Sequence, residues 1–193
     1  MGKVLIALLF ILIFLIQIFN IFVLDAIYEW KFIIAIFVAI FVFSFLYVKI
    51  GYGIIKNDFK NKKYDRVISK QNCYLAKKTA LKDSIFYMVA VSYLEQNDID
   101  SFGKFIDKID SKDLYLSKCF LKIIYAIIIC NNDLESEWKD KYDNNPPSVF
   151  KSHLDDILIL LQKAPLKKGS WNADELKIIE SIEIDTIKNM ITN

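Results

Sequence analysis

The sequence predicts an all-α protein in two parts: an N-terminal two-helix transmembrane hairpin in residues 1–50 and an α-solenoid of about three to four helical hairpins in residues 51–193. Charge is concentrated after position 50 in a chain that is 54% hydrophobic and 25% charged. After residue 53 the apolar residues recur at i, i+3 and i+4, without a convincing period-two run, which is typical of helices. The turns between these helices recur about every 35 residues, which is typical of stacked helical hairpins.

The first predicted span runs from Val4 to Leu24, a stretch of twenty-one residues without a charge. At about 1.5 Å per residue, a helix of this length crosses a hydrocarbon core of roughly 30 Å. A cleaved signal peptide is the alternative, because Lys3 precedes the apolar run. That run is longer than the usual ~7 to 15 residues, and Leu24 stands where a small residue is expected. The sequence therefore favours a spanning helix.

The second predicted span covers about residues 32–50, and its core from Phe32 to Val48 is again uncharged. Because only residues 25–31 separate the spans, we expect a tight hairpin with both chain ends on one side of the membrane. Cytoplasmic flanks carry an excess of Lys and Arg. Such residues follow the second span at Lys49, Lys56, Lys60, Lys62, Lys63, Arg66 and Lys70. The sequence therefore predicts a multi-pass protein of the cell membrane with both termini in the cytoplasm.

Both spans carry residues suited to contacts between membrane helices. Gln17 and Asn20 lie three residues apart on one helical face, and Ala35 and Ala39 form a small-xxx-small pair on the second span. Such residues hydrogen-bond across helices or let backbones approach closely. The plainer interpretation is that they hold the hairpin together, or that Asn20 reaches the outer interface. The sharper one is a patch that a partner's membrane helix recognises.

Charge is polarised along the remainder of the chain. From Lys49 to Lys82, ten basic and two acidic residues give a net charge of +8, whereas from Asp83 to Asn193 thirteen basic and nineteen acidic residues give −6. We expect the basic stretch to attract anionic lipid headgroups, at about 1 kcal/mol per well-placed charge. The residues expected at the headgroups are Lys56, Lys60, Lys62, Lys63 and Arg66. The alternative interpretation is that these residues only set the topology. Nucleic acid is not expected as a partner, because the acidic part of the chain would repel it.

Apolar periodicity predicts four helical hairpins after residue 50. The first pairs an extension of the second span, through Gly51 and Gly53, with a short helix that begins at Tyr64. The other helices are expected near residues 79–95, 98–110, 113–130, 133–143, 149–163 and 172–191. Asn172 and Glu175 have the spacing of a capping box at the start of the last helix.

The predicted turns share a polar-polar-apolar-acidic pattern. Their apolar residues are Tyr64, Ile99 and Leu134, which are spaced by 35 and 35 residues. A related turn contains Trp171, 37 residues after Leu134, and follows the helix-breaking pair Pro146-Pro147.

The best local repeat, from Phe86 to Ile109, resembles the tetratricopeptide family, whose unit is an antiparallel helix pair of 34 residues. The residues that match the large, small and aromatic positions of that unit are Phe86, Val89, Ala90, Tyr93 and Ile106. The departure is Phe102, where the family has a small residue, with Glu137 at the equivalent place after the next turn. The resemblance covers about residues 54–143 and implies stacked helix pairs that dock peptides or proteins.

Residues for catalysis are scarce. His153 is the one histidine, and beside Asp155 and Asp156 it is read as a surface or partly buried residue, not a base. Glu180 and Glu183 are expected on one side of the last helix, where flanking lysines make a solvated charged face the favoured interpretation. We therefore expect no enzymatic activity and no catalytic residue.

Cofactor and metal sites are not expected either. The five glycines form neither a phosphate-binding loop nor a dinucleotide fingerprint. Cys73, Cys119 and Cys130 lack the spacing of a zinc site. Cys119 and Cys130 are eleven residues apart, so they are expected on one helical face as reduced core thiols.

Three functions remain open. The leading hypothesis is a membrane-anchored, non-enzymatic adaptor that docks a protein partner at the inner membrane face. The alternatives are an immunity protein against a bacteriocin or membrane-directed toxin, and an accessory subunit of a membrane secretion, transport or defence complex. One Arg among twenty-five basic residues suggests an AT-rich coding sequence and a bacterial host.

Overall fold

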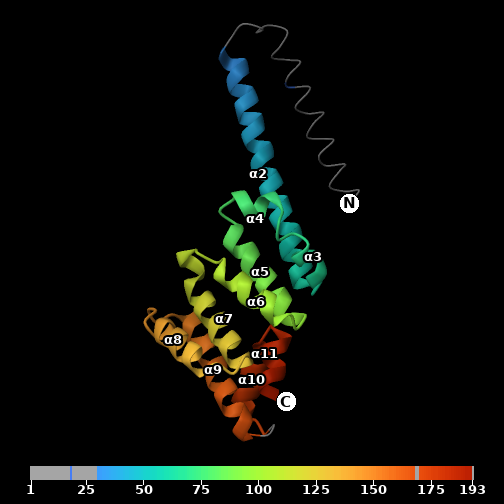
Figure 1. The fold of residues 1–193 in the computed structure, drawn as a ribbon. Coiled ribbons are helices and arrows are strands. Elements are labelled where there is room, and N and C mark those ends of the chain that lie inside the picture. The colour runs from blue at the N-terminus through green and yellow to red at the C-terminus, as the bar shows by residue number, and fades with distance from the viewer. Residues whose placement is uncertain (1–17, 19–29, 168–169, 193) are drawn as a thin grey trace. The chain divides into compact units, whose positions relative to one another are not determined.

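The structure is a computed structural model that describes residue 18, residues 30–167 and residues 170–192. All regular elements of these residues are helices (Figure 1), which confirms the all-α prediction. The chain divides into two compact units, residues 1–50 and residues 51–193. Apart from Ile18, the first predicted span lies outside the described residues.

The long helix α2 runs without interruption from Trp30 to Lys60. Its part from Ile34 to Lys60 is long and apolar enough to cross a membrane, and its most apolar stretch is not buried within the structure. The expected continuation of this helix past Lys49 is confirmed. Among the described residues it is the one helix that meets these criteria.

Two short helices follow, α3 from Tyr64 to Ile68 and α4 from Tyr74 to Lys78, and both pack against α5. The helix expected to begin at Tyr64 is confirmed, whereas α4 was not predicted. Five residues are too few to show a helical period in the sequence.

Two helical hairpins come next. The first consists of α5, Lys82–Glu95, and α6, Ile99–Asp107; the second consists of α7, Tyr115–Ile128, and α8, Asn132–Asp143. A short 3₁₀ helix, Lys112–Leu114, precedes α7. All four helices lie where the periodicity predicted them, with ends that differ by a few residues. The helices of each hairpin pack against each other, and α6 packs against α7.

Three turns in this unit have one backbone form. Lys62, Asn97 and Cys130 have φ values of 55°, 60° and 52°. After each, the next amide donates to a carbonyl five residues back: Lys63 to Asp58, Asp98 to Tyr93 and Asn131 to Ala126, at 2.9, 2.9 and 3.0 Å. This pair of features is the Schellman motif that ends many helices.

The third turn corrects the sequence alignment. Its left-handed residue is Cys130, so the first residue of the following helix is Asn132, which corresponds to Ile99 and Tyr64. The predicted equivalence of Leu134 with Ile99 is therefore off by two residues. The same shift makes Glu135, rather than Glu137, the equivalent of Phe102. Cys130 is exposed at this turn, so its prediction as a core thiol is wrong, whereas Cys119 is buried.

The last part of the chain holds α9, Val149–Lys167, α10, Ala173–Ser181, and α11, Asp185–Thr192. The capping box of Asn172 and Glu175 is confirmed. The single helix predicted over residues 172–191 is wrong, because the chain leaves helical geometry at Ile182, where ψ is 115°. The break lets both short helices pack on α9 while α11 also reaches α5.

Helix α11 makes the contact that departs most from an open stack of hairpins, in which each repeat touches only its neighbours. Thr186 donates its amide to Glu95 Oε1 at 3.0 Å, and Lys62 pairs with Asp185. Ile187 and Ile191 of α11 are buried. The C-terminal segment therefore packs back against the first hairpin of residues 51–193.

Candidate functional site

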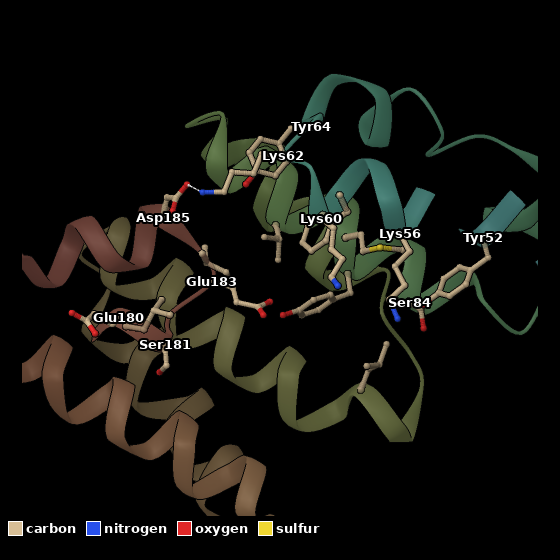
Figure 2. A pocket seen from close by; sticks show the side chains of 17 residues that line it. Tyr52, Lys56, Lys60, Lys62, Tyr64, Ser84, Glu180, Ser181, Glu183 and Asp185 are labelled. Carbon is tan, nitrogen blue, oxygen red and sulfur yellow. Dashed lines mark hydrogen bonds and ion pairs between the residues drawn. The ribbon is translucent and has the colours of Figure 1, made fainter. Parts of the chain in front are cut away.

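A pocket with a volume of about 650 Å³ lies within residues 51–193. The last two turns of α2 form one wall, α5 forms the floor, and the connection between α10 and α11 forms the opposite wall (Figure 2). We call it the α2–α5 cavity. Its lining residues from α2 are Tyr52, Lys56, Phe59 and Lys60; those from α5 are Ser84, Tyr87, Met88 and Val91; and those from the opposite wall are residues 180–185. Lys62, Tyr64 and Leu114 complete it.

The five residues expected at lipid headgroups separate into groups. Lys56 and Lys60 line the α2–α5 cavity, one helical turn apart on α2. Lys62 also borders it but is paired with Asp185. Lys63 and Arg66 are not among the lining residues, although all five side chains are solvent-exposed. The basic stretch is thus divided between a concave site and open surface.

Charges of opposite sign face one another in the cavity. Figure 2 shows the amines of Lys56 and Lys60 and the carboxylate of Glu183 directed into it, while Glu180 points away. Within the described residues, the ion pairs of the structure involve neither of these two lysines nor Glu183. Besides the paired Lys62 and Asp185, the lining therefore carries Lys56 and Lys60 on one wall and Glu180 and Glu183 on the other, and Glu183 is the acidic group of these two that points inward.

Two tyrosines that line the cavity have raised pKa values. Burial raises the pKa of Tyr87, and the nearby charge of Glu183 raises it further. Burial also raises the pKa of Tyr64 to about 12, with added contributions from Glu95 and Asp185. Both hydroxyls therefore stay protonated at neutral pH and can donate hydrogen bonds.

A second, smaller pocket of about 320 Å³ adjoins the segment Ser181–Ile184. His153 lines it, together with Ser117, Tyr87 and Glu183. Among the described residues, His153 has no hydrogen bond to either serine of this pocket, and the Ser181 hydroxyl donates to the carbonyl of Ile178 at 2.6 Å. The partly buried position of His153 agrees with its interpretation as a surface or partly buried residue.

The acidic pair expected on the last helix is not on one helix. Glu180 belongs to α10, whereas Glu183 lies in the non-helical connection to α11. The break at Ile182 places Glu183 in the α2–α5 cavity, a position that helical periodicity could not predict. In the described part of the chain no cluster of His, Cys, Asp or Glu has the geometry for a metal ion.

The residues expected to contact membrane helices are only partly described. Gln17 and Asn20 lie outside the described residues. Ala35 and Ala39 lie one turn apart on α2, with Ala35 exposed and Ala39 half-buried.

The chain matches no protein-family model, no curated protein and no solved structure.

Proposed function

We propose that the chain is a membrane-anchored, non-enzymatic adaptor whose helical domain docks a protein partner at the inner face of the membrane. The observation that carries the anchor is the exposed apolar surface of α2. Phe37 and Phe41 are 68% and 74% exposed, and Ile34, Phe45 and Tyr47 are also exposed. A contiguous apolar surface of this kind marks an interaction site. A lipid bilayer is its natural covering, because the helix is long enough to span one.

In this proposal the anchor is a two-span hairpin, with residues 4–24 as the other span. The uncharged run from Val4 to Leu24 supports that span, and the basic residues after α2 support a cytoplasmic location for both termini.

The domain after the anchor is proposed to be a tetratricopeptide-like stack. Its support is the shared Schellman turn at Lys62, Asn97 and Cys130, with spacings of 35 and 33 residues. Further support comes from the matched positions Phe86, Val89, Ala90 and Ile106, which are buried in the first hairpin. Helix pairs that repeat at this interval form modules with extended docking surfaces.

Helix α8 is the proposed docking surface. Asp133, Glu137 and Asp140 fall at i, i+4 and i+7 on one exposed face of this helix, where Glu137 also pairs with Lys141, and Tyr142 is the buried anchor of the helix. Helix α11 already covers part of α5, so α8 is the more open surface. An acidic face attracts a basic segment, and the attraction weakens as salt is added.

Photo-crosslinking of the full chain in cells tests this proposal. A crosslinker at Asp133 or Asp140 is expected to capture one partner repeatedly, and capture should fall when Glu137 is changed to Gln. Neutralising Asp100 and Asp174, exposed acids on α6 and α10, is the matched control and should leave capture unchanged. Equal capture in the α8 variant and in the control would contradict the proposed surface.

The accessory-subunit alternative is favoured by the small residues on α2. Ala35 and Ala39 would let a partner's membrane helix approach closely. Crosslinks from Ala35 to membrane proteins, without crosslinks from α8, would select this alternative over the adaptor. The immunity alternative predicts instead that expression in a sensitive strain protects it from a toxin encoded beside this gene.

A further inference from the structure

We propose that the α2–α5 cavity binds one zwitterionic amphiphile, a molecule with a phosphodiester, a nearby ammonium group and a short apolar portion. This is the chemistry of a phosphoethanolamine lipid headgroup with the first carbons of its chains. The proposal does not depend on the adaptor function, because it rests on the charges and volume of a cavity that α8 does not line.

The phosphate is proposed to lie between Lys56 and Lys60. These residues are at i and i+4 on α2, so their Cβ atoms are about 5–6 Å apart. Figure 2 shows both amines directed into the cavity. Two ammonium groups at this spacing can hold one phosphate from two sides through charge-assisted hydrogen bonds.

The ammonium group is proposed to lie against Glu183. Its carboxylate points into the cavity from the wall opposite the lysines (Figure 2). The backbone there is held in place, because Ile182 and Ile187 on either side are buried. Asp185 is already paired with Lys62, and Glu180 points away. One carboxylate facing two lysines matches a ligand with separated opposite charges better than it matches a simple anion.

The apolar portion is proposed to lie against the apolar part of the lining. This part includes Met88, Val91, Leu114 and Ile184. The volume of about 650 Å³ is within the range of roughly 300–1,000 Å³ that is usual for small-molecule sites. It accommodates a headgroup with a few methylene groups, and not two full acyl chains.

A membrane lipid is the source to test first. Lys56 and Lys60 follow the uncharged run that ends at Val48 by eight and twelve residues in the sequence. A free headgroup metabolite has the same polar chemistry without the apolar portion, so the experiment includes it.

The test uses the full chain in nanodiscs of phosphatidylglycerol, titrated with dihexanoyl phosphatidylethanolamine. Hydrogen exchange of peptides covering residues 84–91 and 180–185 reports occupancy of the cavity. Dihexanoyl phosphatidylglycerol supplies the phosphate without the ammonium, and phosphoethanolamine supplies both charges without the chains. The variants are Lys56→Gln with Lys60→Gln, and Glu183→Gln. The matched control is Lys63→Gln with Arg66→Gln, which removes the same number of positive charges outside the cavity.

We expect saturable protection by the ethanolamine lipid, with a midpoint at least about tenfold lower than that of either partial probe. The double lysine variant should raise this midpoint at least about tenfold, Glu183→Gln should abolish the preference over phosphatidylglycerol, and the control should change neither. Equal midpoints for the two lipids would overturn the proposal that the ligand carries an ammonium group. A midpoint for phosphoethanolamine equal to that of the ethanolamine lipid would overturn the proposal that the ligand has an apolar portion. Absence of saturable protection in the wild type would overturn the site, whatever the variants do.

Discussion

Gly103 of α6 lies directly against the ring of Tyr125 of α7: a Cβ atom on Gly103 would be 2.7 Å from Tyr125 Cε2. The same ring packs edge-on against Phe102, with ring centroids 6.0 Å apart. Phe102 is fully buried at the position where the tetratricopeptide pattern has a small residue. In this chain the glycine beside Phe102 provides the close approach between the two hairpins.

Substitution of this glycine should destabilise the helical domain. In Gly103→Ala the new methyl group forces Tyr125 out of its position, and overpacking of this kind costs about 1–3 kcal/mol. That cost exceeds the gain of up to about 1 kcal/mol from replacing a helical glycine. Thermal unfolding followed by circular dichroism should show a lower Tm.

Gly53→Ala is the matched control for this substitution. Gly53 is also helical, but no atom lies within 4 Å of a Cβ placed on it. The control should therefore be neutral or stabilising, by up to about 1 kcal/mol. A higher Tm for both variants would show that α6 and α7 do not meet at Gly103.

Lys122 is a buried cation whose partner is exposed. Its side chain is only 8% exposed, its Nζ lies 2.6 Å from Asp107 Oδ1, and the rings of Tyr125 and Trp138 are nearby. Removing the Asp107 carboxylate leaves the Lys122 ammonium buried without a counter-charge. Removing the ammonium instead also removes its desolvation cost. We expect Asp107→Asn to lower the free energy of unfolding more than Lys122→Met does, as measured by urea titration. The opposite order would contradict the burial of Lys122.

Glu175 should control acid stability at the start of α10. Lys167, at 2.5 Å, and the backbone amide of Asn172, at 3.0 Å, lower the pKa of this carboxyl to about 2, with Lys163 contributing at 3.2 Å. Since the folded-state pKa is depressed, the stabilisation is present above the ordinary value of 4.5 and is lost as the pH falls from there through about 2.

Melting temperatures between pH 2 and pH 6 test this contribution. Glu175→Gln should lower Tm at pH 6 and have little effect at pH 2, which flattens the acid limb of the profile. Asp174→Asn, at an exposed neighbouring carboxylate, should leave the shape of the profile unchanged. Parallel profiles for the wild type and Glu175→Gln would refute the role of this group.

The contact between Lys62 and Asp185 should limit the opening of α11. The hydrogen bond to Asp185 raises the pKa of Lys62 above its ordinary value of 10.5. The pair is therefore intact at neutral pH and is lost only as the pH rises through that higher value. Because both side chains are exposed, Asp185→Asn should speed amide exchange in residues 185–192 only roughly two- to fivefold. Asp110→Asn removes the exposed pair with Lys82 and should leave α11 unaffected. Equal acceleration in both variants would contradict this role.

The sequence predicted the helices that are long and amphipathic, and it missed features that depend on distant contacts. The apolar spacing around Ile85 and Ile124 placed α5 and α7, although both helices are buried on more than one face: residues 88–92 and 119–124 are buried in succession. The turn at Cys130 was misplaced by two residues, since a cysteine gives no signal for a left-handed backbone. The spacing of Asn172 and Glu175 is sufficient to predict the capping box, because this motif depends only on residues three apart in the sequence.

The α2–α5 cavity had no sequence signal of its own. The sequence marks Lys56 by its charge alone, and it predicts Glu183 on a helix that in fact ends at Ser181. More than 120 residues separate these two positions in the sequence. The cavity exists because α11 packs on both α5 and α9, a tertiary contact that overrides the local helical preference of Ile182–Ile184.

The central claim, an anchor that holds residues 51–193 in the cytoplasm, is tested most directly by thiol labelling in intact cells. Cys130 is exposed and Cys119 is buried, so Cys73→Ser leaves Cys130 as the reactive thiol of the described residues. A membrane-impermeant maleimide should label Cys130 only after the membrane is permeabilised, and should label Ala26→Cys, in the predicted outer loop, without permeabilisation. Labelling of Cys130 in intact cells, or recovery of the wild-type chain in the soluble fraction, would contradict the claim.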